Sequence, residues 1–208
     1  MIYKMQKIDT IIFDLGGVLV DWNPEYVYRK VFDGNEKKME WFLTNVCSPE
    51  WNIEQDAGRT IDEAEKLKIA EFPEYKELIK LFYKDWEYMF SGIIEENVHI
   101  LNQLKASKKY KLYALTNWSA EKWDKALELF PFFKEFDGVV VSGQEKCRKP
   151  FNKIYEIIIK RYNINPTKSI FIDDNYDNVQ AAKKLGLNGI HHSVIEPLSK
   201  NIDKFQLL

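Results

Sequence analysis

The segment Ile11-Ile12-Phe13-Asp14-Leu15-Gly16-Gly17-Val18-Leu19-Val20 places an aspartate at the end of a short apolar run and follows it with two glycines. Residues 8–13 are rich in β-branched and aromatic side chains without helical spacing, which is typical of a strand buried on both faces of a parallel sheet. Such sheets bind ligands just beyond the carboxyl ends of their strands. The glycines permit positive φ and a close approach to the backbone. The segment therefore predicts a strand that presents Asp14 to a ligand, and a strand-ending turn capped by Asp14 is the structural alternative.

Four further segments have the apolar, β-rich composition of short strands, and helical patterns separate them from one another. This alternation predicts an α/β fold with a doubly wound parallel sheet. In such a sheet the first strand lies between the second and the fourth, so the expected strand order is 3-2-1-4-5. The four candidate strands are Lys111 to Leu115, Gly138 to Val141, Ser169 to Ile172 and Asn188 to Ile190.

The alternation disappears between Tyr26 and Phe90, where only helical signals remain. Asn23-Pro24 and Ser48-Pro49 each pair a capping residue with a first-turn proline, and Thr60-Ile61-Asp62-Glu63 fits a capping box. We therefore expect residues 21–92 to form an inserted helical domain, and residues 1–20 and 93–208 to form the sheet domain. The aromatic residues of the insertion are expected to be mainly core, and the candidates for a pocket there are Arg29, Trp51, Glu54 and Arg59.

Composition excludes several classes of function. The 208 residues carry a formal net charge of −2, which gives no positive field to attract nucleic acid or an anionic membrane surface. No apolar run is long enough to span a bilayer, and no secretory signal pattern is present. Cys47 and Cys147 do not form a metal-type pair and are expected to be free thiols, so a cytoplasmic location follows. Nothing in the sequence indicates an oligomeric state.

Three of the later strands lead into residues that can bind phosphate or metal. Thr116-Asn117 offers a hydroxyl and an amide, Lys149-Pro150 offers a cation, and Asp173-Asp174 offers two carboxylates. Each has a structural alternative: helix capping by Thr116 or Ser119, a surface lysine, and compensation of the acids by a helix starting near Asn178. Because neighbouring strand ends meet at one edge of the sheet, we expect Asp14, Thr116 and Asp174 to converge. Paired carboxylates there suit Mg²⁺ joined to phosphate oxygens.

These motifs resemble those of the haloacid dehalogenase superfamily, most of whose members are phosphatases that form a phosphoaspartate. Its four motifs stand in order as Phe13-Asp14-Leu15-Gly16, Leu115-Thr116-Asn117, Lys149-Pro150 and Phe171-Ile172-Asp173-Asp174, with the insertion where the family's helical cap belongs. Bacterial sugar-phosphate phosphatases of the glucose-1-phosphate type are the most similar group. The resemblance implies a Mg²⁺-dependent phosphatase acting on a small phosphorylated metabolite.

The resemblance also implies roles for individual residues. Asp14 would be the nucleophile, and Asp14, the Gly16 carbonyl and Asp174 would hold Mg²⁺, with Asp173 in or just outside that shell. Thr116 and the Asn117 N–H would bind the phosphoryl group, and Lys149 would neutralise its charge.

One departure concerns Gly16, where most phosphatases of the superfamily carry an aspartate that acts as general acid and base. Its absence predicts a substrate whose leaving group needs little protonation, such as an anomeric sugar phosphate or an acyl phosphate. Asp21 and Asp177 are conceivable replacements, and the sequence singles out neither.

Two alternatives remain. Metal-independent 2-haloacid dehalogenases share this departure, but the acidic pair Asp173-Asp174 would repel a carboxylate substrate. A module that binds phosphate ligands without turnover is the non-enzymatic alternative.

Overall fold

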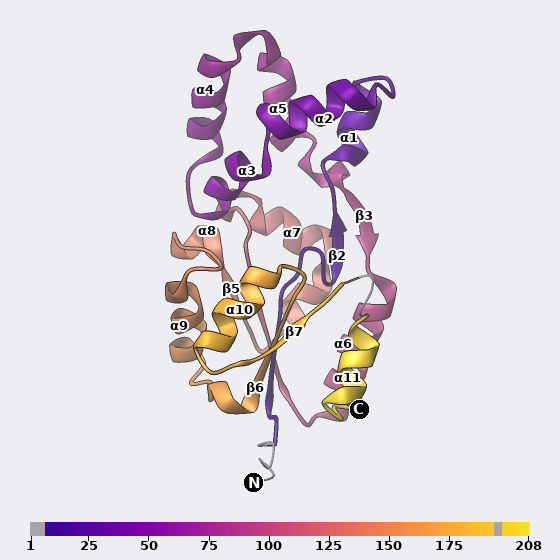
Figure 1. Ribbon diagram of the computed structural model, residues 1–208, viewed down its shortest axis with the longest axis vertical. Coiled ribbons are helices and arrows are strands. Elements are labelled where there is room, and N and C mark those ends of the chain that lie inside the picture. The colour runs from indigo at the N-terminus through magenta and orange to yellow at the C-terminus, as the bar shows by residue number, and fades with distance from the viewer. Residues whose placement is uncertain (1–6, 194–196) are drawn as a thin grey trace.

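The computed structural model describes residues 7–193 and 197–208, and a sheet of five parallel strands forms its centre (Figure 1). The strand order is β5-β4-β1-β6-β7, so the predicted order 3-2-1-4-5 is confirmed. The first strand begins at Thr10 rather than at Ile8, and the other ends differ from expectation by a single residue or agree with it. The strands are β1 Thr10–Phe13, β4 Lys111–Thr116, β5 Gly138–Val141, β6 Ser169–Asp173 and β7 Asn188–His191.

The side chains of the sheet alternate between two buried layers. Ile11 and Phe13 belong to one apolar cluster, whereas Ile12 belongs to another on the opposite face. The first cluster is covered by α6 Glu95–Ser107, α7 Trp123–Leu129 and α11 Leu198–Lys204, and the second by α9 Asn152–Arg161 and α10 Tyr176–Lys184. The short α8 Ser142–Glu145 directly follows β5. Burial on both faces explains why these strands are continuous apolar runs rather than alternating ones.

A second, two-stranded antiparallel sheet joins the core to the helical region, and the sequence did not predict it. Its strands are β2 Val20–Trp22 and β3 Phe90–Ile93, with Val20 opposite Ile93 and an irregularity between Asp21 and Trp22. These strands lie where a simple chain crossing was expected. Both crossings therefore belong to one hydrogen-bonded ribbon, which rises from the core toward the upper helices in Figure 1.

The region between β2 and β3 is helical, as predicted, and forms a cap above the carboxyl ends of the sheet strands (Figure 1). Ser48 and Thr60 each accept a backbone hydrogen bond at a helix start, which confirms both expected caps. Near Asn23-Pro24, helix α1 begins at Glu25 with Pro24 in the capping position. The cap helices are α1 Glu25–Val31, α2 Glu36–Asn45, α3 Pro49–Asp56, α4 Ile61–Glu71 and α5 Lys76–Lys84.

Two predicted helices differ in their starts. The chain after Ser119 first forms a 3₁₀ turn over Ala120–Lys122, and the Ser119 side chain makes no capping hydrogen bond, so the expected cap there was wrong. Helix α10 begins at Tyr176 rather than near Asn178, because Asn175 caps it by accepting from the N–H groups of Asp177 and Asn178. Among the described residues, no helix has the length and apolarity needed to cross a bilayer.

Phe171 tests how much the fold depends on the sheet core, because it is fully buried in β6 and its ring lies 5.6 Å from that of Tyr155. We expect Phe171→Ala to lower the free energy of unfolding by about 3–5 kcal/mol, from lost transfer energy and the cavity left behind. Leu67, which is 55% exposed on α4, is the control, and Leu67→Ala should change it by less than about 0.5 kcal/mol. Urea unfolding followed by circular dichroism measures both, and equal effects would contradict the assignment of the core.

Candidate active site

The carboxyl ends of β4, β1 and β6 lie side by side, and each carries residues singled out in the sequence. Phe13 is opposite Ala114 on one side and Ile172 on the other, so Asp14 leaves the sheet between the ends of two neighbouring strands. The N–H of Asp14 donates to the Ile172 carbonyl at 2.8 Å, which anchors the start of the loop to β6. The predicted convergence at this edge is therefore present in the structure.

The loop after Asp14 is a tight turn. The Gly17 N–H donates to the Val20 carbonyl at 2.9 Å, and the Leu19 N–H donates to the Leu15 carbonyl at 2.8 Å. Gly17 has φ of 70°, and a Cβ there would lie 2.2 Å from Asp174 Oδ2. Glycine at this position thus permits both the turn and the close approach of the Asp174 carboxylate to the backbone.

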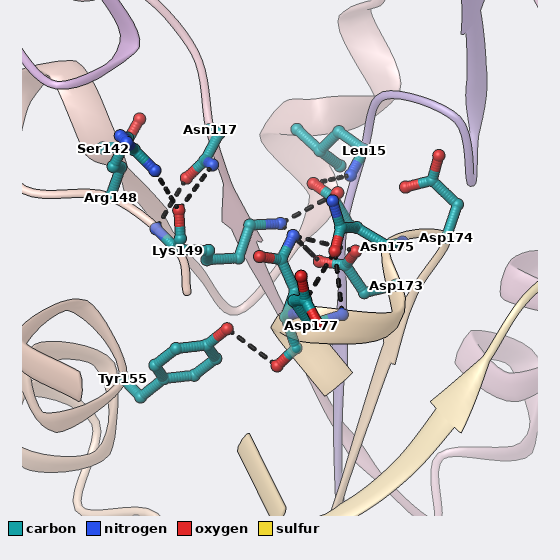
Figure 2. A network of polar contacts seen from close by, with 12 residues as sticks. Leu15, Asn117, Ser142, Arg148, Lys149, Tyr155, Asp173, Asp174, Asn175 and Asp177 are labelled. Atoms are coloured by element: carbon teal, nitrogen blue, oxygen red, sulfur yellow. Dashed lines mark hydrogen bonds and ion pairs between the residues drawn. The ribbon is translucent and has the colours of Figure 1, made fainter. Parts of the chain in front are cut away.

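Lys149 is the cation of the site, and it is fully buried. Its Nζ lies 2.8 Å from Asp14 Oδ2 and 2.6 Å from Asp173 Oδ2, so a single ammonium bridges the two acids (Figure 2). Asn117 holds the lysine backbone, since its side chain accepts from the Lys149 N–H and donates to the Lys149 carbonyl. Burial would lower the pKa of Lys149, but Asp14 and Asp173 outweigh it and raise that pKa. The side chain is therefore a charged ammonium.

Asp173 and Asp174 are adjacent in sequence but have different surroundings. Both oxygens of Asp173 are engaged: Asn175 N–H donates to one, Lys149 to the other, and the Asn178 amide lies 3.1 Å from each. Groups at the start of α10 thus compensate the charge of Asp173, which is the structural alternative expected for the acidic pair. In Figure 2 the Asp174 carboxylate lies apart from this network and carries no dashed line. Asp174 is also exposed, whereas Asp14 and Asp173 are buried, so a cation that enters the site can reach its carboxylate.

One oxygen of the Asp14 carboxylate is held by the backbone, and the other is held by Lys149. The Leu15 N–H donates to Asp14 Oδ1 at 2.7 Å, and Lys149 contacts the other oxygen. Burial raises the pKa of Asp14 well above its usual range, and the charges of Asp173 and Asp174 raise it further, whereas Lys149 lowers it. Asp14 and Asp173 thus share one ammonium, with the charge of Asp174 close by, and a second cation would stabilise the ionised form of Asp14.

The carboxylates around Asp14 suit a divalent cation that prefers oxygen ligands. Asp14, Asp173 and Asp174 each offer a carboxylate oxygen within 4.8 Å of the others, and the charge left after Lys149 is counted is that of two anions. Among residues 7–193 and 197–208, no histidine or cysteine joins this group, which suits Mg²⁺ better than a softer metal. Within the same ranges, no atom lies within 4 Å of the position that a Cβ would occupy at Gly16.

Thr116 ends β4 beside these acids. Its side chain is 1% exposed, and its hydroxyl oxygen has no hydrogen-bond partner within the described ranges 7–193 and 197–208. A buried hydroxyl without a partner is unfavourable, and an anion bound at the end of β4 would supply the missing bond.

A cavity of about 250 Å³ lies between the sheet edge and the cap. Its floor is polar and comes from the core, whereas much of its wall is aromatic. Phe90 from β3 stacks on Trp118 at 5.7 Å, which joins the ribbon between core and cap to the cavity wall. The lining residues are Asp14, Gly16, Gly17, Trp22, Asn52, Asp56, Tyr83, Trp86, Phe90, Asn117, Trp118, Ser119 and Asp174.

The structure brings the predicted core residues together. Asp14, Gly16, Asn117 and Asp174 line the cavity, while Lys149, Asp173 and Thr116 are buried directly around Asp14 and the ends of β4 and β6. Cys47 and Cys147 are free thiols, as expected.

The predicted pocket residues of the cap were wrong. Arg29 forms exposed ion pairs with Glu25 and Glu36, and Glu54 is exposed. Trp51 packs edge-on against Phe82 in the cap core, and Arg59 donates to Gln55 and to the Trp51 carbonyl.

Asn52 and Asp56 of α3 line the cavity instead, and the sequence analysis missed both. They are four residues apart and therefore share one helix face, and this spacing is the only signal in the sequence that could have suggested them together.

The two glycines after Asp14 give a matched test of this loop. We expect Gly17→Ala to lower the free energy of unfolding by about 1–3 kcal/mol, because the new Cβ meets the Asp174 carboxylate and φ is positive. Gly16→Ala has open space at its Cβ and should change that free energy by less than about 1 kcal/mol. Chemical unfolding of the two variants measures the difference, and an equal loss in both would contradict the close approach of Asp174.

Comparison with known proteins identifies the family of this chain. The sequence model of the haloacid dehalogenase-like hydrolase family matches residues 8–186 of this chain. The phosphorylated carbohydrates phosphatase of Thermotoga maritima is 29% identical over 198 residues, which cover 90% of this chain and 87% of that protein. The sesquiterpene phosphatase astK of Aspergillus oryzae is 28% identical over 188 residues, which cover 86% and 87%.

A solved structure shares the fold. It is a HAD family enzyme from Bacteroides thetaiotaomicron in complex with magnesium and inorganic phosphate, with a TM-score of 0.68 and 23% identity, covering 93% of this chain and 98% of that one. At this identity the likeness concerns the fold alone. The family match, by contrast, spans the sheet domain and the cap, and the chain therefore belongs to the haloacid dehalogenase-like hydrolases.

Proposed function

We propose that this hydrolase is a Mg²⁺-dependent phosphatase that removes the phosphoryl group of a small phosphorylated carbohydrate through a phosphoaspartate on Asp14. The observation that carries the proposal is the placement of Asp14 at the floor of a cavity, held by Lys149 and the Leu15 N–H, next to two further acids. A carboxylate in this position can attack a phosphorus atom, and the surrounding charges are those that phosphoryl transfer requires.

Several residues contribute to the first step, the attack of Asp14 on phosphorus. The Leu15 N–H fixes the plane of the Asp14 carboxylate, which orients its attacking oxygen. Lys149 lies within hydrogen-bond distance of Asp14, so a phosphoryl oxygen beside that aspartate is within its reach. Loss of one such charge-stabilising contact typically costs about 3 kcal/mol of barrier. Thr116 and the Asn117 N–H would hold the remaining phosphoryl oxygens, which gives the orphaned hydroxyl its partner.

The metal would be held by Asp14, Asp174 and the Gly16 carbonyl. Asp173 then lies outside the shell, because each of its oxygens already has two donors, from Lys149, Asn175 and Asn178, whereas each oxygen of Asp14 has one. When bound, Mg²⁺ would neutralise negative charge on the phosphoryl group and keep Asp14 ionised. The magnesium and phosphate bound by the fold-related Bacteroides enzyme support this assignment.

The cavity suits a small and partly polar molecule. Its volume of about 250 Å³ lies near the lower end for ligand sites, and its wall combines aromatic rings with the side chains of Asn52, Asn117 and Ser119. Rings can pack against the faces of a sugar, while amides and hydroxyls can bond its hydroxyl groups. The Thermotoga phosphatase of phosphorylated carbohydrates supports the same substrate class.

The cap would select the substrate, and we propose that it extends over residues 21–92. Helix α3 and the region from Tyr83 to Phe90 supply its part of the cavity wall. We place the enzyme in the cytoplasm, and the lack of a disulfide between Cys47 and Cys147 is consistent with that location.

Replacement of the nucleophile tests the reaction. Asp14→Asn should lower phosphate release from a panel of sugar phosphates by at least about 10³-fold, because the amide cannot form the aspartyl phosphate. Removal of Mg²⁺ with EDTA should abolish the wild-type rate, and Asp203→Asn, an exposed acid on α11, should leave that rate unchanged. Release of chloride from 2-chloropropionate is measured in parallel.

Three results would contradict the proposal. They are phosphate release that survives both EDTA and Asp14→Asn, halide release without phosphatase activity, and binding of inorganic phosphate without any turnover. The second result would identify a dehalogenase, and the third a non-catalytic binding module.

The assigned metal ligand can be tested by binding alone. Asp174→Asn should weaken Mg²⁺ affinity by at least about 10-fold in calorimetric titration, because a free carboxylate oxygen is lost. The melting temperature of the metal-free protein should stay equal or rise, since one of three clustered acids is removed. Asp177→Asn, an exposed acid in the first turn of α10, is the control and should retain the affinity. Equal affinities in the two variants would exclude Asp174 from the shell.

A further inference from the structure

The proposed reaction lacks a proton donor on the core side of the site. Gly16 has no side chain to offer, and the two replacements considered from the sequence do not line the cavity. Asp21 of β2 accepts hydrogen bonds from Tyr26 of α1 and Ser91 of β3. Asp177 is exposed in the first turn of α10. A group that protonates the leaving oxygen must therefore come from elsewhere in the described residues or from water.

Asp56 is a carboxyl group of the cap that lines the same cavity as Asp14. It is the last residue of α3, one turn beyond Asn52, and both side chains lie on the cavity face. The face is held in place by Tyr83 of α5, which donates to Asn52 at 2.7 Å and accepts from Gln55 at 3.0 Å. Asp56 thus stands on a supported helix rather than on a free loop.

The chain after Asp56 is packed closely on the core. Gly58 has φ of 101°, and a Cβ there would lie 3.2 Å from the Gly143 carbonyl oxygen and 3.0 Å from Lys146 Cγ. A larger residue would push the end of α3 away from α8. Glu121 of the core accepts from the Ile61 N–H at 2.7 Å, so a second contact follows within the next turn. Asp56 is therefore fixed against the core at the mouth of the site.

The groups that face Asp56 come from both parts of the molecule. The core contributes Arg148, Lys149 and the backbone N–H of Ser119, and the cap contributes the Tyr83 hydroxyl. Burial raises the pKa of Asp56 to about 7, although Arg148, Lys149 and the Ser119 N–H each lower it. A carboxyl group with a pKa near neutrality can both donate and accept a proton under working conditions.

We propose that Asp56 is the general acid and base of the reaction, supplied by the cap in place of the side chain that Gly16 lacks; this rests on the proposed phosphatase function. Asp14 lies on the sheet edge and Asp56 on the cap, at different walls of one cavity. Attack in line with the breaking bond directs the leaving oxygen away from the nucleophile and hence toward the cap.

The protons balance over two steps. As the Asp14 oxygen bonds to phosphorus and the bond to the leaving oxygen breaks, the proton of the Asp56 carboxyl passes to that oxygen and a neutral alcohol departs. In the second step water attacks the phosphorus of the phosphoaspartate, its proton passes to the Asp56 carboxylate, and phosphate and free Asp14 are released. Asp56 thus returns to its protonated form after each turnover.

This role changes the expectation about substrates. With an acid at Asp56, the leaving group need not be an anomeric or acyl oxygen, and ordinary alkyl phosphates of sugars become suitable. The restriction to easily expelled leaving groups, inferred from Gly16 alone, would then not apply.

A leaving-group series tests the proposal. For Asp56→Asn, kcat/KM should fall by about 10²- to 10⁴-fold with a sugar 6-phosphate, whose alkoxide needs a proton. With acetyl phosphate and p-nitrophenyl phosphate, whose leaving groups are stable anions, it should fall by less than about 10-fold. Glu54→Gln makes the same acid-to-amide change on the exposed face of α3 and should follow the wild type with every substrate. Thermal melting of both variants checks that α3 remains folded.

The pH profile of the wild-type enzyme is a second test of the role of Asp56, and it requires no variant. Because the protonated acid is the active form in the first step, kcat/KM for the sugar phosphate should fall as the pH rises through about 7. For acetyl phosphate that fall should be absent, since its leaving group needs no proton.

The outcomes separate the two proposals. If the wild type hydrolyses none of the substrates, the phosphatase function fails. If it hydrolyses them and Asp56→Asn lowers all rates equally, or none, Asp56 only binds substrate or plays no part, and the proposal for Asp56 is overturned. Identical pH profiles for both leaving groups would also overturn it.

Discussion

The buried ammonium of Lys149 between Asp14 and Asp173 is the interaction on which the site depends. A buried charge is unfavourable unless it is paired and hydrogen-bonded, and here the two acids meet that requirement. The Asn117 side chain holds the backbone of Lys149 in place. The contact also joins three strand ends, because the lysine follows β5 and its partners follow or end β1 and β6. Removing the lysine would leave two carboxylates facing each other in a buried setting. The ion pair therefore contributes to the fold at the same point where it prepares the chemistry.

The cap contributes in a different way, through shape rather than charge pairing. Aromatic side chains from the region Tyr83 to Phe90 and from Trp22 line the cavity above the polar floor, where Asp14 is buried. Burial strengthens the electrostatic contacts there and shifts the pKa of Asp14 and of Asp56 upward. The topology explains these two roles, because the edge of the sheet positions the charged groups and the inserted cap determines their surroundings.

The sequence predicted the sheet and the core residues of the site well, because both rest on local signals. Strands buried on two faces are continuous apolar runs, and parallel topology brings their ends together, so Asp14, Thr116 and Asp174 could be expected at one edge, and Lys149 was added as the opposite charge for phosphate. The cap was predicted only as helical. Which face of α3 meets the cavity depends on how Gly58 packs against Gly143, a contact between distant segments without a local signature. Strands β2 and β3 were missed for the same reason, because each is too short to show a period of its own and exists only by pairing with the other.

The ribbon of β2 and β3 has a mechanical consequence. Its two strands are hydrogen-bonded to each other, so they form one connection rather than two independent linkers, and movement of the cap relative to the core must involve both strands together. Phe90 belongs to this ribbon and stacks on Trp118 of the core. A change in the ribbon at Phe90 would therefore also disturb this ring stack. Displacement of the cap and rearrangement of the cavity wall are thus mechanically coupled.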